Sequence, residues 1–64
     1  MKVRDLLKLL ERNGWSIVRI RGSHRQFRHE SRPGVLTVAG KPSVEIPLGT
    51  LKAILKQAGL EEEG

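Results

Sequence analysis

A glycine-serine pair, Gly22-Ser23, constrains the fold of this chain more than any other feature. Glycine accepts the positive φ that the first loop position of a type II′ turn requires, so the pair predicts a tight hairpin. The residues after it alternate around Phe27 as an apolar anchor, which is typical of a strand over residues 23–29. The preceding segment, residues 15–21, is predicted to be the strand that pairs with it.

A two-residue loop also determines which residues of the two strands lie opposite one another. The expected cross-strand pairs are Arg21 with His24, Arg19 with Gln26, and Val18 with Phe27. Residues that share a face with Phe27 are expected to face the core; they are Val18, Ile20 and Arg25. The opposite, open face would carry Arg19, Arg21, His24, Gln26 and Arg28. Ile17 would also lie on this open face unless a β-bulge shifts the register.

Two amphipathic helices are predicted, one near each end of the chain. The first has apolar residues at i, i+3, i+4 and i+7, namely Val3, Leu6, Leu7 and Leu10. Asn13-Gly14 ends it, and a Schellman motif would pack Trp15 on Leu10. The second begins between Pro47 and Thr50, and its apolar stripe is Leu48, Leu51, Ile54, Leu55 and Ala58. Gly59 ends it in the same way, which would place Leu60 against Leu55.

Between the hairpin and the last helix, Arg32-Pro33-Gly34-Val35 has proline and glycine where a type II turn favours them. This predicts a third strand over residues 35–39, with Leu36 and Val38 facing the core. The order α-β-β-β-α then gives an α+β fold, in which both helices cover one face of a three-stranded antiparallel sheet. Residues 1–60 are expected to form a single domain, and residues 61–64 an acidic tail.

Composition limits how such a domain is held together and what it can bind. The 64 residues include no cysteine, so a thin core must suffice without disulfides, and a cytoplasmic location is expected. No segment approaches the roughly 20 apolar residues that cross a membrane, so no membrane association is expected. The net charge is +5, and residues 12–32 hold six arginines against one acid, Glu30. Such a surface attracts a polyanion or an acidic partner.

Several of these segments resemble one family. They are Asn13-Gly14-Trp15, Gly22-Ser23-His24, Phe27-Arg28-His29 and the stretch from Gly49-Thr50-Leu51 to Gly59-Leu60. The order α-β-β-β-α resembles the double-stranded RNA-binding domain, and the segments together resemble the HicA toxins, also called YcfA-like proteins. The likeness covers nearly the whole chain. Many relatives carry a further histidine just after the third strand, where this chain has Ala39-Gly40-Lys41.

The resemblance implies a metal-independent endoribonuclease, an mRNA interferase of a type II toxin–antitoxin pair. It implies that His24 is the catalytic residue, that mRNA is the substrate and that a HicB-like antitoxin covers the site. Histidine suits proton transfer near neutral pH, and arginine suits stabilisation of the phosphorane charge. No cofactor is expected. The basic residues expected to bind the RNA are Arg19, Arg21, Arg25, Arg28, Lys41 and Lys52.

Other interpretations of the same residues remain open. His29 is five residues from His24 and would point to the opposite face, so the two are not paired as acid and base. Ser23 fits a turn residue, because no acid lies near His24 to complete a triad. His24, His29 and Glu30 lack a metal-ligand spacing. The fold alone would equally suggest a non-catalytic double-stranded RNA-binding module, and the basic face a protein-interaction domain with an acidic partner.

Overall fold

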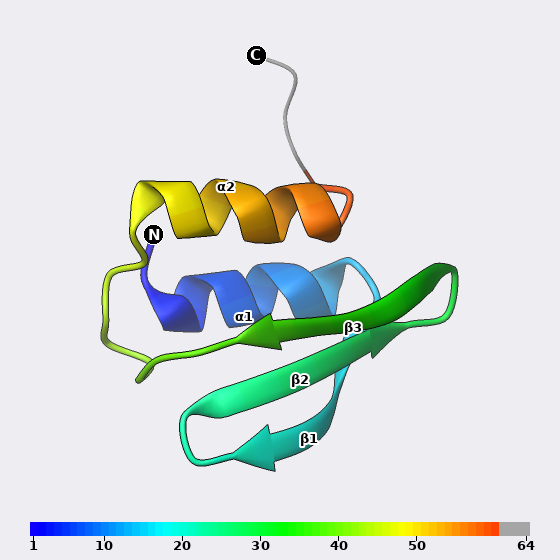
Figure 1. Cartoon of the computed structure of the whole chain (residues 1–64), viewed down its shortest axis with the longest axis horizontal. Coiled ribbons are helices and arrows are strands. Elements are labelled where there is room, and N and C mark those ends of the chain that lie inside the picture. Colours follow the sequence, from blue (N-terminus) through cyan, green and yellow to red (C-terminus); the bar gives the residue numbers. More distant parts are fainter. Residues whose placement is uncertain (61–64) are drawn as a thin grey trace.

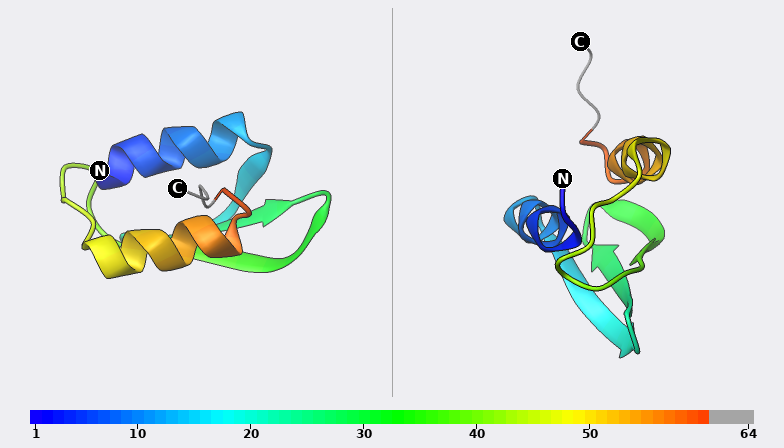
Figure 2. Two further views of the ribbon diagram at one scale, coloured as in Figure 1. Left: turned by 90° about the horizontal axis from the view of Figure 1, so that it is seen from above. Right: turned by 90° about the vertical axis from the view of Figure 1, so that its left-hand side faces the viewer.

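The computed structural model describes residues 1–60 and has the predicted order of elements. They are α1 (Val3–Arg12), β1 (Trp15–Arg21), β2 (His24–His29), β3 (Arg32–Val38) and α2 (Leu48–Gln57). The strands form an antiparallel sheet in the order β1-β2-β3. Both helices lie on the same side of this sheet and leave its other side open (Figures 1 and 2). The predicted α+β architecture is confirmed, whereas the predicted acidic tail, residues 61–64, lies outside the described residues.

The core lies between the sheet and the two helices. Its fully or almost fully buried apolar residues come from every element and from the loop before α2: Val3, Leu6, Leu10, Trp15, Phe27, Leu36, Val38, Ile46, Ile54 and Ala58. Phe27 is the largest side chain that is completely buried. Trp15 is buried in the same cluster as Leu10, which fits the structural role predicted for it. Neither helix within residues 1–60 is long and apolar enough to span a membrane.

Glycine ends both helices. Gly59 has φ +75° and donates its N–H to the Lys56 carbonyl at 3.1 Å, while Leu60 donates to the Leu55 carbonyl at 2.8 Å. These two bonds define the predicted Schellman motif. At the end of α1, Gly14 has φ +90° and donates to the Glu11 carbonyl at 3.2 Å, which is one bond of the same pattern. The prediction that Leu48 belongs to the buried stripe of α2 is wrong, because Leu48 lies in the first turn and is 66% exposed.

The pairing of β1 with β2 differs from the predicted register at one point. Arg21 lies opposite His24 and Arg19 opposite Gln26, as predicted, but the register then shifts and Ile17, not Val18, lies opposite Phe27. Val18 is therefore the extra residue of a β-bulge. The bulge turns Ile17 to the helix side of the sheet.

Two further predictions for β1 are wrong, because Val18 and Ile20 do not enter the core. Val18 is 54% exposed and Ile20 is 60% exposed. Ile20 does lie on the side of Phe27, since it pairs with Arg25, but β1 starts at the end of α1 and runs away from both helices toward the Gly22-Ser23 turn (Figures 1 and 2). Within the part of the chain that the structure describes, no helix covers the second half of β1, so the aliphatic side chains there remain in solvent.

The connection from β2 to β3 is also shorter than predicted. The turn consists of Glu30 and Ser31, and His29 pairs with Arg32, so β3 begins before Pro33 rather than at residue 35. Proline is tolerated there because β3 is an edge strand. Gly34, with φ +86°, lies where the register between β2 and β3 shifts. Leu36 and Val38, which follow it, are buried as predicted.

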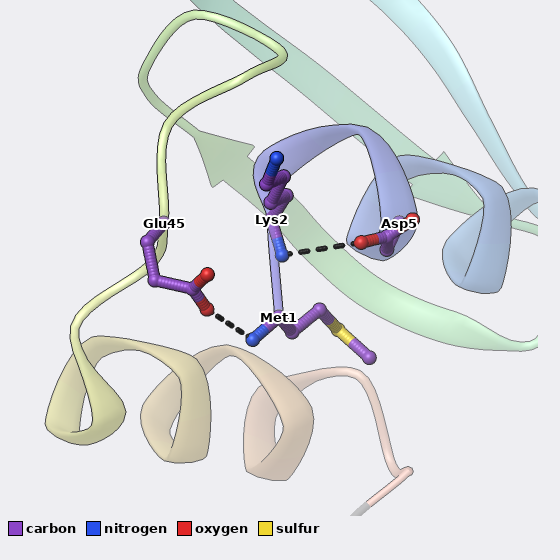
Figure 3. Close-up of polar contacts among 4 residues, drawn as sticks. All are labelled: Met1, Lys2, Asp5 and Glu45. Carbon is purple, nitrogen blue, oxygen red and sulfur yellow. Dashed lines mark hydrogen bonds and ion pairs between the residues drawn. The ribbon is translucent and has the colours of Figure 1, made fainter.

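The first residues of the chain are hydrogen-bonded to the loop between β3 and α2. Met1 accepts a hydrogen bond at 3.0 Å from the Ile46 N–H, and Val3 donates to the Val44 carbonyl at 2.9 Å. The amine of Met1 pairs with the Glu45 carboxylate, and Asp5 accepts the Lys2 N–H at 3.3 Å (Figure 3). A carboxylate in the first turn of α1 is favourable because the free N–H groups of the helix point toward it.

Candidate functional site

The hairpin turn places His24 at the edge of the open face. Gly22 has φ +59°, and Ser23 does not have a positive φ, so only the first loop residue is left-handed, as type II′ requires. This turn closes on the pair of Arg21 and His24. His24 therefore begins β2 with its side chain exposed, on the side of the sheet away from Phe27.

Two rows of side chains run across the open face beside the turn. One row contains Arg21 and His24, and the next contains Arg19, Gln26 and Thr37. Opposed Cβ atoms in an antiparallel sheet are about 4.5–5.5 Å apart, and successive rows on one face about 7 Å apart. The five side chains line a hollow of ≈ 290 Å³.

The chemistry of this hollow follows from its lining. Two guanidinium groups attract a phosphate, an amide and a hydroxyl can hydrogen-bond it, and an imidazole can take up or give a proton near neutral pH. None of the five lining residues is acidic. The hollow therefore suits a phosphodiester rather than a cationic ligand.

Gln26 was predicted to lie on this face but was not among the predicted site residues, and Thr37 was not predicted at all. The signal for Thr37 was available. Leu36 and Val38 were predicted to face the core, and alternation then directs Thr37 to the open face. Its position opposite Gln26 was not available, because that depends on the register between β2 and β3.

The other basic residues expected to bind RNA are distributed over different surfaces. Arg28 is exposed, lies on the open face by alternation and pairs with Ser16, toward the other end of β2 and outside the hollow. Lys52 is on α2, where it borders an apolar groove between the two helices. The groove lies on the helix side of the sheet, so the structure does not bring Lys52 together with His24.

Arg25 also lies on the helix side, where it supports the hairpin instead of lining the hollow. Its guanidinium donates to the Gly40 carbonyl at 3.1 Å, and the Gly40 N–H donates to the Ser23 carbonyl at 3.2 Å. These two bonds tie the turn before His24 to the segment after β3. Lys41 is exposed and follows Gly40 directly, so it lies close to the turn end of the sheet.

His29 has a structural environment that differs from that of His24. Its Nδ1 accepts the Ser31 N–H at 3.0 Å, so the neutral ring carries its proton on Nε2 and donates it to the Asn13 carbonyl at 2.8 Å. The ring also packs edge-on against Trp15, with centroids 5.2 Å apart. The two histidines lie on opposite faces, and both nitrogens of His29 are hydrogen-bonded, Nε2 to the end of α1 and Nδ1 to the turn after β2.

The fold and this face are consistent with a small α+β domain of the double-stranded-RNA-binding-domain type that presents a histidine among arginines. A comparison with protein families identifies the chain further. The sequence model of the HicA toxin of bacterial toxin-antitoxin matches residues 3–60, so the chain belongs to the HicA toxin family. No curated protein matches the chain. Membership implies the toxin of a toxin–antitoxin pair, with an antitoxin as its partner, and toxins of this family are generally mRNA-cleaving.

Proposed function

We propose that the protein is a metal-independent endoribonuclease that cleaves mRNA on the open face of its sheet, with His24 as the acid–base catalyst. The observation that carries this proposal is the position of His24 in a hollow shared with Arg19 and Arg21. The family membership supports it, because HicA toxins generally cleave mRNA. The natural inhibitor in this proposal is a HicB-like antitoxin.

The substrate supplies the nucleophile, since the 2′-OH of RNA is adjacent to the scissile phosphate. The reaction then needs a proton acceptor for that hydroxyl, a proton donor for the leaving 5′ oxygen, and positive charge around the phosphorane. His24 serves in proton transfer, which contributes about 10²–10⁴-fold in rate. Arg19 and Arg21 neutralise the phosphorane, and Gln26 and Thr37 hold the non-bridging oxygens.

The residues that line the hollow also favour chemistry without a metal ion. Mg²⁺ is usually bound through carboxylates, and the lining offers two guanidinium groups, an imidazole, an amide and a hydroxyl. Intramolecular attack by the 2′-OH requires no metal-activated water. Cleavage is therefore expected to persist in EDTA and to leave a 5′-hydroxyl on the downstream fragment.

The test compares wild type with His24→Ala on a labelled mRNA, with binding and cleavage measured separately. We expect cleavage to fall by about 10²–10⁴-fold while the circular dichroism spectrum stays unchanged, because the lost side chain is exposed. Lys52→Ala is the matched control, since it removes a cation from the helix side and should leave cleavage intact. A DNA copy or a 2′-O-methyl RNA should be inert.

Two results would contradict the proposal. Undiminished cleavage by folded His24→Ala would remove the catalytic role, and cleavage of DNA would indicate a hydrolytic nuclease instead. RNA binding by the wild type with no cleavage of any mRNA would favour the alternative, a non-catalytic double-stranded RNA-binding module.

A further inference from the structure

We infer that the outer edge of β1 is a docking site for an extended polypeptide strand that carries acidic side chains on one face and aliphatic ones on the other. Within residues 1–60, β1 pairs only with β2, and no other backbone hydrogen bond involves it. Its outer main-chain groups therefore have no backbone partner within these residues, and β1 lies at an edge of the sheet (Figure 1). An added strand would satisfy both the donors and the acceptors of this edge.

The side chains of β1 indicate what such a strand must carry. On the helix side, Ile17 is 38% exposed and Ile20 is 60% exposed, and Val18 at the bulge is 54% exposed. These are three of the six large exposed apolar residues of the described chain, and they lie within four consecutive positions. Aliphatic side chains from a neighbouring strand would remove them from water.

The opposite face of β1 supplies the charge complementarity. Arg19 and Arg21 lie there, β1 contains no acid, and neither guanidinium takes part in a salt bridge within residues 1–60. Acidic side chains at alternate positions of the incoming strand would lie beside these arginines, because residues two apart share a face.

Two other occupants fit this edge less well. RNA would pair with the arginines, but it would leave the aliphatic side chains in water. A second copy paired antiparallel through β1 would put Arg19 and Arg21 of both copies on one face, and like charges across a strand pair are destabilising. The features together favour a heterologous, acidic polypeptide.

Docking at this edge has a consequence for the open face. Arg19 and Arg21 line the hollow with His24, so acidic side chains paired with them would remove the positive charge that attracts the phosphate. Inhibition by this route rests on the proposed function, whereas docking itself does not. The natural source of the strand would be the antitoxin, which family membership implies.

The experiment uses the purified cognate antitoxin as the probe and the variant Ile20→Lys. Lysine on an edge strand opposes strand addition. The substitution also raises the positive charge, so it would strengthen a purely electrostatic attraction to an acidic partner. Strand addition predicts the opposite, a rise in Kd by about tenfold or more in calorimetry. RNA cleavage should stay unchanged, because Ile20 is on the helix side.

Leu48→Lys is the matched control, since it makes the same change at a residue of the inter-helix groove that is 66% exposed. It should leave the Kd unchanged. By NMR, amide exchange at Ile20 should slow in the complex. Ile20 precedes Arg21, which forms the hydrogen-bonded pair that closes the turn, and the N–H of Ile20 therefore points away from β2. Wild-type affinity in Ile20→Lys would overturn the inference, as would weakening by Leu48→Lys or unchanged exchange at Ile20. Each readout is independent of cleavage, so a protein that binds the antitoxin without cleaving RNA would contradict only the proposed function.

Discussion

The closeness of His29 to Gly14 allows a stability prediction that tests the structural role of this histidine. Gly14 has φ +90°, and a Cβ placed on it would lie 2.6 Å from Nε2 of His29. Gly14→Ala therefore has two costs. The left-handed backbone costs about 1–2 kcal/mol for a residue with a side chain. Displacing the ring breaks its bond to the Asn13 carbonyl, which costs about 0.5–1.5 kcal/mol.

The expected loss for Gly14→Ala is therefore about 1.5–3.5 kcal/mol. At about 0.05–0.15 kcal/mol per residue, the 60 described residues correspond to a total stability of about 3–9 kcal/mol. The substitution removes a large part of it. A small domain loses about 4–8 °C in Tm per kcal/mol, so the melt should shift down by roughly 6–28 °C.

The assay is a urea and thermal melt followed by circular dichroism in a double-mutant cycle with His29→Ala. Without the ring, Gly14→Ala should keep only its backbone cost, so the two changes should couple by about 0.5–1.5 kcal/mol. An equal cost of Gly14→Ala in both backgrounds would refute the contact with His29. A cost below about 0.5 kcal/mol would refute the backbone argument as well.

Three further predictions concern the core, the open face and the hairpin support. Phe27→Ala should lower the free energy of unfolding by about 3–5 kcal/mol and leave the free protein largely unfolded at 37 °C, while antitoxin at 100-fold its Kd should restore about 2.7 kcal/mol. A thermal melt of the free variant close to wild type would contradict the burial of Phe27. Arg21→Glu should weaken RNA binding and reduce by about one unit the slope of log K against log salt concentration, whereas Lys52→Glu should have a smaller effect on both. Equal effects of the two variants in a salt titration would mean that RNA is not bound on the open face. Arg25→Ala should speed amide exchange at Gly40, because the Gly40 carbonyl accepts the hydrogen bond from Arg25, and it removes no group from the hollow. Unchanged exchange at Gly40 would show that this hydrogen bond does not support the hairpin.

The sequence alone determined the elements that depend on local chemistry. A turn with one left-handed residue needs glycine, and Gly22-Ser23 therefore predicted both the hairpin and the pair of Arg21 and His24. Helical periodicity and the two terminal glycines likewise predicted α1 and α2 with their ends. The placement of His24 and His29 on opposite faces followed from strand alternation.

Only the tertiary structure decided which apolar residues are covered. Val18, Ile20 and Leu48 are as apolar as the core residues, yet they are exposed, because no element among residues 1–60 packs over the second half of β1 or the first turn of α2. The bulge that turns Ile17 inward also depends on long-range packing, since it lets Ile17 lie opposite Phe27. A residue pattern has no information on where the covering helix stops.

The same distinction applies to the site. Charge and alternation in the sequence assigned Arg19, Arg21 and His24 to one face. The sequence did not reveal that Thr37 completes the hollow or that Arg25 bonds to Gly40, because both depend on how β3 and the segment after it pair with the hairpin. Lys52 is as basic as the arginines, but the fold puts it on the helix side of the sheet. Local sequence defines which side chains a strand presents, and the packing of distant segments defines which of them meet.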